Sequence, residues 1–376
     1  PAQGTLSETP RDRGTHMDFE PTDDQLALQA QLRRFLDDRV TPEARRAIAD
    51  LPGAVDRDLW HDLGGMGVFA LTLPKSRGGV GLGFADATLL FEELGRAAVP
   101  GPLIGTFLAA GLGGNIGADI SGRAATGDAV VGLVPARPVF VDHVAALDAL
   151  LVVADEGVTL TGRPAGSRRV DRPLDPLTPV DVVEALPAGH AVGGPDDAAR
   201  LRTVGGLLAA ALQVGLADAA VTLATDYAKD RTQFGRAIGS FQAIKHLLAD
   251  AQVGLEVARA AVQAAGVEID EAAEDTGGDE GGAAGGTDDG GAPAAGDGDD
   301  LAGDDAAGHR ACRAVDAARI VASRAADRAT RACIQVHGGM GFTWALDAHL
   351  FLKRALVLDV GVGSPDESLE ALAAAL

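Results

Sequence analysis

Two short segments of the 376-residue chain carry side chains that could hold a nucleotide. The first, residues 231–250, reads RTQFGRAIGSFQAIKHLLAD, and the second, residues 335–343, reads QVHGGMGFT. A guanidinium suits a phosphate or pyrophosphate because its planar fork donates parallel hydrogen bonds. A side-chain amide can serve a nucleotide, and paired glycines let a backbone approach a ligand closely. The candidate cofactor-binding residues are Arg231, Gln233, Phe234, Gln242, Gln335, Gly338 and Gly339.

The same residues have a plainer interpretation. The two glycines could simply end a helix, and Arg231 could make a surface ion pair. His337, inside the glycine turn, is expected to make a structural or nucleotide contact rather than to transfer protons. The adjacent Glu92 and Glu93 are expected to be charges on a helix face, because neighbouring helix residues point in different directions. Spacing alone leaves the nucleotide site and the helix end as open alternatives.

The elements that must position these residues run in the order helices, strands, helices. Residues 17–126 are mostly helical, with apolar side chains at helical spacing. Residues 127–195 contain short β-branched runs bounded by Gly, Pro and Asp, which predict a small β domain. Residues 196–376 predict an antiparallel helical bundle. Its long runs rich in Ala and Leu are residues 198–230, 240–266 and 306–336. The expected fold is therefore mainly α with a small middle β domain.

The charge of the chain restricts its partners. The 54 Asp and Glu exceed the 32 Lys and Arg, and the formal charge is −22 at pH 7. This excess of acid excludes nucleic acid and an anionic membrane surface as partners. Residues 267–308 hold 14 of the acids, 12 glycines and no Lys or Arg, which predicts a disordered insert in the bundle. Without the insert the net charge is −8.

The two cysteines and the N-terminus bear on the compartment. Cys312 and Cys333 exclude a disulfide framework and fit a cytoplasmic protein. Neither has a partner at metal-ligand spacing, so we expect small buried thiols and no metal site. Residues 1–16 are interpreted as a vector-derived leader, because the GTHM run at 14–17 has the form of a cloning junction.

Together with the EELGR run at 92–96 and the loop at 74–83, the two segments resemble the acyl-CoA dehydrogenase family of flavoproteins. The resemblance covers most of residues 17–354 and involves four motifs in the family's order. It implies an N-terminal helical domain, a middle β domain and a C-terminal four-helix bundle. It also implies FAD at a subunit interface, where Arg231, Phe234 and Gln242 would contact the FAD of the neighbouring subunit. The turn with Gln335, Gly338 and Gly339 would contact the adenine half.

The chain departs from the family where the catalytic base belongs. Members abstract an α-proton from the thioester with a glutamate while hydride passes to the flavin. Of the two places where members carry this base, the first falls on Val362 and the second on Gly205, and neither side chain can take a proton. Asp359 lies near the first place but is a shorter carboxylate. The segment that cradles the flavin in catalytic members also has no counterpart in residues 127–142.

These features lead to the hypothesis of a non-catalytic subunit, with no catalytic residue of its own. The resemblance to heteromeric actinobacterial steroid acyl-CoA dehydrogenases suggests an α2β2 assembly with a partner that carries the glutamate. The complex would dehydrogenate an acyl-CoA, for example a steroid side-chain CoA thioester, with FAD as acceptor. Two alternatives remain: a homo-oligomeric enzyme whose base is Asp359, and a non-enzymatic scaffolding homologue without flavin contact.

Overall fold

The computed structural model describes residues 21–112, 114–135, 140–276, 300–361 and 364–375. The leader, the middle of the acidic insert and Val362 therefore lie outside the described residues. The chain begins with helices, whose first turns follow from local capping. The hydroxyl of Thr22 accepts from the Gln25 amide at 3.3 Å, and the Gln25 side chain accepts from the Thr22 amide at 2.8 Å. The N-terminal helices are α1 (Asp23–Arg39), α2 (Pro42–Ala49), α3 (Arg57–Gly65), α4 (Phe84–Arg96), α5 (Leu103–Ala110) and α6 (Gly114–Ala125).

Short strands follow and form two small sheets. The four-stranded sheet has the order β1-β3-β4-β7, in which β1 runs parallel to β3 and the other pairs are antiparallel. The three-stranded sheet has the order β2-β6-β5 and is antiparallel. The strands are β1 (Val131–Pro135), β2 (Phe140–Asp142), β3 (Ala149–Ala154), β4 (Gly157–Thr161), β5 (Arg168–Arg169), β6 (Val180–Val182) and β7 (His190–Gly193).

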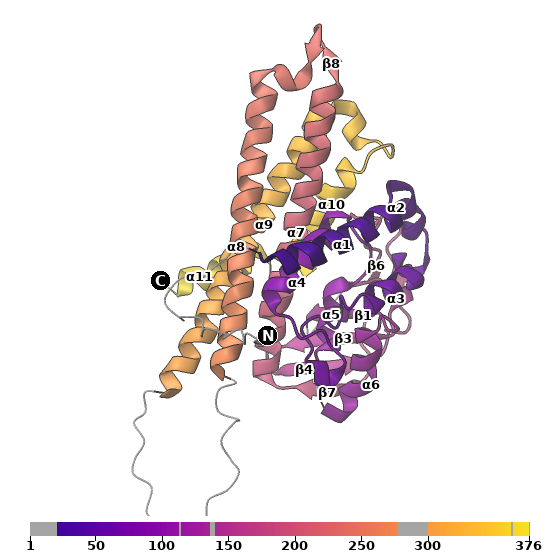
Figure 1. The fold of residues 1–376 in the computed structure, drawn as a ribbon. Helices are drawn as coiled ribbons and strands as arrows, with labels where there is room; N and C mark the ends of the chain where they lie inside the picture. Colours follow the sequence, from indigo (N-terminus) through magenta and orange to yellow (C-terminus); the bar gives the residue numbers. More distant parts are fainter. Residues whose placement is uncertain (1–20, 113, 136–139, 277–299, 362–363, 376) are drawn as a thin grey trace, which may run out of the picture.

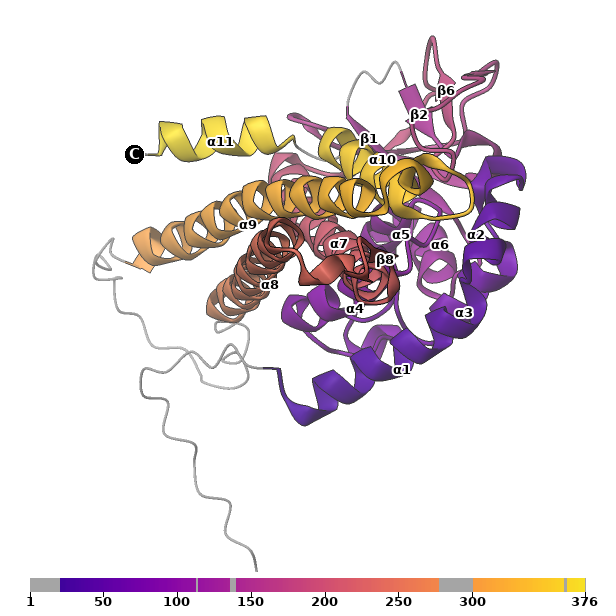
Figure 2. The same cartoon turned by 90° about the horizontal axis from the view of Figure 1, so that it is seen from above.

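The remainder is a bundle of long helices. Figure 1 shows α7 (Pro195–Asp230), α8 (Gln242–Thr276) and α9 (Asp300–His337) running alongside one another. Seen from above, α10 (Ala348–Gly361) and α11 (Pro365–Ala374) lie against α9 (Figure 2). The expected fold class, mainly α with a small β part and a C-terminal bundle, is confirmed.

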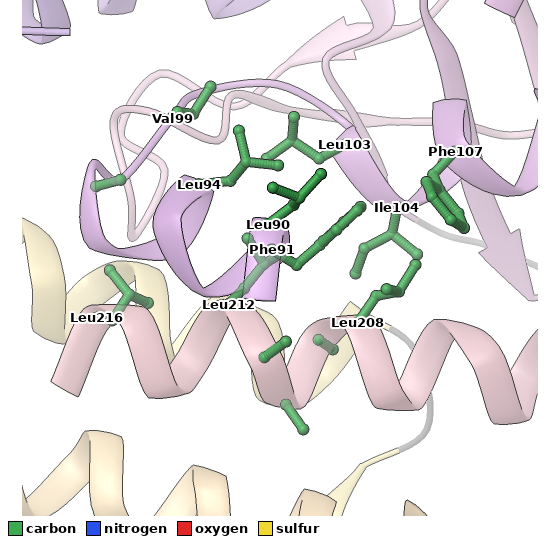
Figure 3. Close-up of a cluster of buried hydrophobic side chains, with 14 of the residues drawn as sticks. Leu90, Phe91, Leu94, Val99, Leu103, Ile104, Phe107, Leu208, Leu212 and Leu216 are labelled. Atoms are coloured by element: carbon green, nitrogen blue, oxygen red, sulfur yellow. The ribbon is translucent and has the colours of Figure 1, made fainter. Parts of the chain in front are cut away.

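The N-terminal helices meet the bundle at the crossing of α4 and α7. A Cβ on Gly95 would lie 2.1 Å from the Leu212 carbonyl oxygen, and one on Gly215 would lie 1.9 Å from that of Glu92. The two backbones can therefore touch at this crossing. Around it, side chains of α4, α5, α7 and the segment between α4 and α5 form an apolar core (Figure 3). Those that the figure labels are Leu90, Phe91, Leu94, Val99, Leu103, Ile104, Phe107, Leu208, Leu212 and Leu216.

The expectation that Glu92 and Glu93 form a charged helix face is wrong, because both side chains are buried. Glu93 is 0% exposed and accepts from Arg33 at 2.7 and 2.9 Å and from Arg96 at 2.8 Å. Glu92 accepts from Arg259 of α8 at 2.9 Å. Burial raises the pKa of Glu92, and the guanidinium of Arg259 opposes that rise. The two carboxylates do point in different directions, but α1 covers one direction and α8 the other.

The acidic insert is also shorter than its composition predicts. Helix α8 continues to Thr276 and α9 begins at Asp300, so both ends of residues 267–308 are helical. Asp270 explains why the first end folds, since it accepts from the backbone amides of Phe84 at 2.7 Å and Ala85 at 2.9 Å. It thus caps the start of α4 from another helix. A count of acids and glycines cannot reveal such a long-range cap.

One apolar helix and the two cysteines differ in how far they are buried. Helix α7 is long and apolar enough to cross a membrane by length and composition, but 78% of its most apolar window is buried within the protein. It is therefore the central helix of the bundle. Cys333 is buried as expected. The expectation of burial is wrong for Cys312, which is exposed on α9 at 3.5 Å from the Thr203 hydroxyl.

Candidate functional site

The first predicted segment forms a tight hairpin at the tip of the bundle (Figure 1). Helix α7 ends at Asp230, and the carbonyl of the next residue, Arg231, accepts from the Ile238 amide at 2.8 Å. Strands β8 (Thr232–Gln233) and β9 (Arg236–Ala237) are paired antiparallel around a two-residue turn. That turn has φ +52° at Phe234 and +76° at Gly235. Positive φ at both central residues is what a type I′ hairpin turn requires, and glycine suits its second position.

Phe234 is the unusual residue of this hairpin. A bulky side chain in the left-handed region is strained, and here it is also 92% exposed. Its ring makes an edge contact with Phe241 at 6.2 Å between centroids, and the guanidinium of Arg236 lies 4.1 Å from the centre of the Phe241 ring. The hairpin therefore holds an aromatic face away from the core, where a planar ligand could stack on it.

Arg231 and Gln242 flank the hairpin, and both are exposed. No carboxylate of the described residues lies within ion-pair distance of Arg231, so the surface ion pair of the plainer interpretation is not formed within this part of the chain. Lys229, two residues earlier, pairs with Asp226 at 3.0 Å instead. The hairpin thus offers a cation, an amide and an aromatic ring to a ligand outside the fold.

The second segment lies at the end of α9, at the same end of the bundle. The His337 ring is buried and stacks on Tyr227 of α7 at 4.3 Å, and its Nδ1 donates to the Cys333 carbonyl at 2.8 Å. His337 is therefore structural, as expected, and ties the end of α9 to the end of α7. This contact places the two predicted segments at the same end of the bundle.

The glycine turn is open. Gly338 has φ +59°, which fits the helix-ending interpretation. No atom lies within 4 Å of a Cβ built on either Gly338 or Gly339, which leaves the backbone accessible to a ligand. Gln335 is exposed beside them. Sequence reasoning did not single out Phe342 and Trp344, which follow the turn and are 71% and 57% exposed.

These residues fit one side of a dinucleotide site. A cation suits the pyrophosphate, an aromatic ring and amides suit the base or sugar, and an open glycine turn allows close approach. All seven candidates are exposed, so the side that would face a ligand is open in the described part of the chain.

A separate cavity of about 100 Å³ lies where α5, β1, β2, α7 and α10 meet. It is lined by Ala209 and Leu212 of α7 and by Gly361 at the end of α10. Gly205 lies four and seven residues before these α7 positions and so on the same helix face. Gly361 directly precedes Val362. Of the two places where a base was expected, Gly205 therefore lies on the α7 face that borders this cavity, whereas Val362 is outside the described residues.

Asp359, the alternative base, does not line the cavity. Its Oδ1 accepts from Gln213 at 2.6 Å and lies 3.7 Å from the guanidinium of Arg319. Gln213 and Arg319 are buried at the junction of α7, α9 and α10, so the carboxylate helps to anchor α10. This geometry does not favour a catalytic role for Asp359.

The polar side of the cavity is charged. Arg354 of α10 donates to Asp175 at 2.6 Å and to the Val99 carbonyl at 3.2 Å, and its Nη2 is buried without a hydrogen-bond partner among the described atoms. Burial, aided by the carboxylate of Asp175 and opposed by Arg354, raises the pKa of Asp142 to about 6. Burial lowers the pKa of His143 to about 4, so this imidazole is neutral at pH 7.

We expect Asp142→Asn to raise the melting temperature above pH 6 and to leave it unchanged near pH 4. Because the folded chain binds the Asp142 proton more tightly than the unfolded chain, its contribution to stability is complete below pH 4 and is lost as pH rises through about 6. The ionised carboxylate costs up to about 3 kcal/mol at pH 7.5. Thermal melts from pH 4 to 8, with the exposed Asp119→Asn as control, measure this. An asparagine variant that is less stable at pH 7.5 would show instead that Arg354 needs the charge.

Comparison with known proteins finds matching family models and related sequences. The family model "Acyl-CoA dehydrogenase, N-terminal domain" matches residues 22–117. The model "Acyl-CoA dehydrogenase, C-terminal domain" matches residues 200–284 and 301–376. Acyl-CoA dehydrogenase IpdE2 of Mycobacterium tuberculosis is 33% identical over 94% of this chain and 97% of its own. The IpdE2 of Mycolicibacterium smegmatis is 30% identical over 92% of this chain and 97% of its own.

Solved structures share the fold. A variant of the Tcur3481–Tcur3483 steroid ACAD superposes with a TM-score of 0.76 at 23% identity, covering 93% of this chain and 97% of that one. The ChsE4–ChsE5 complex from Mycobacterium tuberculosis gives a TM-score of 0.74 at 22% identity, covering 95% and 98%. At these identities the likeness concerns the fold.

Proposed function

Because the chain belongs to the acyl-CoA dehydrogenase family, whose cofactor is FAD, we propose that it completes the FAD site of a catalytic partner subunit. In this proposal the base comes from the partner, because Val362 and Gly205 cannot take a proton. The complex would carry out the α,β-dehydrogenation of an acyl-CoA thioester, and the family membership supports this oxidoreductase chemistry.

The observation that carries the proposal is a contrast between two regions of the chain. The seven nucleotide-binding candidates are exposed together at one end of the bundle. The cavity beside the α7 face that carries Gly205 measures about 100 Å³ and is bordered by an ion pair and a neutral imidazole. Sites for small-molecule ligands usually measure about 300–1,000 Å³, so this cavity suits a few water molecules.

Each retained residue has a role toward the cofactor of the partner. Arg231 would hold the pyrophosphate, Phe234 would pack against the nucleotide, and Gln242 would hydrogen-bond to it. Gln335 and the open turn at 338–339 would contact the adenine half. Bound FAD supplies the hydride acceptor, and a glutamate of the partner would remove the α-proton.

The names of the related proteins suggest the substrate and the assembly. One structure of this fold is a steroid ACAD and another is the ChsE4–ChsE5 complex. We therefore propose a steroid side-chain CoA thioester as substrate and an α2β2 assembly. A homo-oligomeric enzyme is less favoured because Asp359 is held by Gln213 and does not line the cavity. A scaffold without flavin contact is less favoured because Phe234 is held in a strained backbone conformation with its side chain 92% exposed.

The proposal is tested by native mass spectrometry of the chain expressed alone and with acyl-CoA dehydrogenase subunits from its genomic neighbourhood. We expect bound FAD and acyl-CoA oxidation in the co-expressed sample and neither in the chain alone. Stoichiometric FAD and turnover by the chain alone would refute the proposal and favour the homo-oligomeric enzyme.

A further inference from the structure

We infer that Phe241 is a positioning residue of the nucleotide-binding wall, the exposed surface formed by the seven cofactor-binding candidates. Its ring holds the hairpin of residues 231–238 in the orientation that presents Arg231 and Phe234 to FAD. The inference rests on the proposed function and adds the residue that sets the geometry of the site. It also implies that this part of the wall is formed before the partner and its cofactor bind.

The backbone alone gives the tip of the hairpin little stability. Strands β8 and β9 have two residues each, and even a longer isolated two-stranded ribbon is marginally stable in water. Phe234 adds strain, because its backbone is left-handed with φ +52°. The hydrogen bond from the Ile238 amide to the Arg231 carbonyl closes the base of the hairpin, away from this turn. Side-chain contacts are therefore needed to keep the tip in one conformation.

Phe241 has the rigid backbone that such a contact requires. It lies between the hairpin and α8, and its amide donates to the Ile238 carbonyl at 3.1 Å. Its carbonyl accepts from the amides of Ile244 and Lys245, at 3.1 Å each, which starts the first turn of α8. The backbone of Phe241 is thus fixed to the bundle, and its ring can restrain the hairpin against a fixed body.

The Phe241 ring contacts the hairpin at two points, one on each side of Gly235. Its centroid lies 6.2 Å from that of Phe234 with the ring planes at 88°, the edge-to-face geometry that aromatic pairs favour. The guanidinium carbon of Arg236 lies 4.1 Å from the centre of the same ring, within cation–π range. Phe241 is half-buried, whereas Phe234 is 92% exposed. Phe241 therefore acts through its neighbours, and Phe234 is the ring offered to a ligand.

The contact with Arg236 also determines which way the hairpin faces. Gln233 and Arg236 are directly opposite each other in the antiparallel pair, so their side chains share a face. Arg231 has an extended backbone two residues before Gln233 and belongs to the same face. Stacking Arg236 on Phe241 turns this face toward the start of α8. Gln242 is the first residue of that helix, so three of the candidates meet at this junction.

Hydrogen exchange of the full chain without cofactor tests whether the ring supports the hairpin. In Phe241→Leu, which keeps an apolar side chain and removes the ring, we expect the amides of residues 232–238 to exchange at least about threefold faster, because local opening governs exchange. Phe241→Tyr keeps the ring and should exchange as the original chain does. The matched control Phe140→Leu removes an exposed ring from β2 and should leave the hairpin unchanged. All variants should keep the original melting temperature, which separates a local effect from a general loss of stability.

FAD titration into the deflavinated complex tests whether this support matters for the cofactor. We expect Phe241→Leu to weaken FAD binding about three- to tenfold, because binding must then order the hairpin, and Phe241→Tyr to bind as the original does. Arg236→Met removes the cation from the same ring and should weaken binding in the same direction, whether or not Phe241→Leu folds. In a background with Phe234→Leu and Arg236→Met, Phe241→Leu should cause little further loss, because the groups that the ring positions are absent.

The outcomes separate this inference from the proposed function. If the original complex holds no FAD, the proposed function fails, and the cofactor role of Phe241 fails with it. If the complex holds FAD and Phe241→Leu binds it as tightly as the original, only the inference is overturned. Unchanged exchange in Phe241→Leu would overturn it too, because the hairpin would keep its conformation without the ring. An undiminished loss in the background that lacks both contacts would show that Phe241 acts on FAD by another route, which also overturns the inference.

Discussion

Replacing Arg231 with alanine is expected to weaken FAD binding by the assembled complex by about 10- to 100-fold. Truncating one charge-assisted hydrogen-bonding partner of a phosphate costs roughly 1.5–3 kcal/mol, and each 1.4 kcal/mol is a factor of ten. Arg231 is exposed and has no ion pair within the described part of the chain, so the substitution should leave the chain folded. The measurement is a fluorescence titration of FAD into the deflavinated complex.

Lys229→Ala is the matched control for Arg231→Ala. Lys229 lies two residues earlier, and its ammonium already pairs with Asp226 at 3.0 Å. Its loss removes the same formal charge from the same helix end without removing a free guanidinium. We expect the control to bind FAD as the original complex does. Equal effects of both substitutions would indicate a general electrostatic attraction, and no effect of either would favour the scaffolding alternative.

The nucleotide-binding wall could be predicted because its residues are close in sequence. Arg231, Phe234 and Gln242 lie within twelve positions, and a hairpin between two helices must present them at one end of a bundle. The glycine turn follows another helix, and an antiparallel bundle brings that end to the same place. Trp344 was missed because an aromatic residue after a turn gives no signal about its exposure.

Residues that act across long sequence separations were misjudged. Glu92 belongs to a helix whose sequence is amphipathic. Its partner Arg259 lies on α8, 167 residues later in the sequence. Asp270 falls in a stretch whose acids and glycines suggest disorder, yet it caps α4 from a distance of 185 residues in sequence. In both cases a tertiary contact decides whether a charge is solvated or buried, and local composition carries no information about that contact.

The residues that line the cavity could not be predicted from the sequence either. The sequence indicates that Val362 and Gly205 lack a carboxylate, but it does not indicate which polar residues line the cavity beside α7. The structure places Arg354, Asp142 and His143 there. A neutral imidazole and an ion-paired guanidinium stabilise the junction between the β domain and the bundle. The polar side of this cavity is therefore a structural contact.

Asp175→Asn is expected to reduce the free energy of unfolding by about 3–5 kcal/mol, because it leaves a buried guanidinium without its charge partner. The Asp175 side chain is 0% exposed. It accepts from the Leu177 amide at 3.0 Å, the Thr178 hydroxyl at 2.7 Å and Arg354 at 2.6 Å. Chemical denaturation followed by circular dichroism measures the loss. The exposed pair of Arg331 and Asp327 provides the control, and Arg331→Ala should cost less than about 1 kcal/mol.

A double-mutant cycle with Arg354→Met tests whether the charge is the cause. If the buried cation is what destabilises the asparagine variant, removing it as well should recover part of the loss, because a neutral pair no longer requires solvation. The double variant is therefore expected to be more stable than the sum of the two single changes predicts, by about 1–3 kcal/mol. Strict additivity would mean that Asp175 acts through its hydrogen bonds to Leu177 and Thr178. The junction would then depend on the local turn at 175–178 rather than on the ion pair to α10.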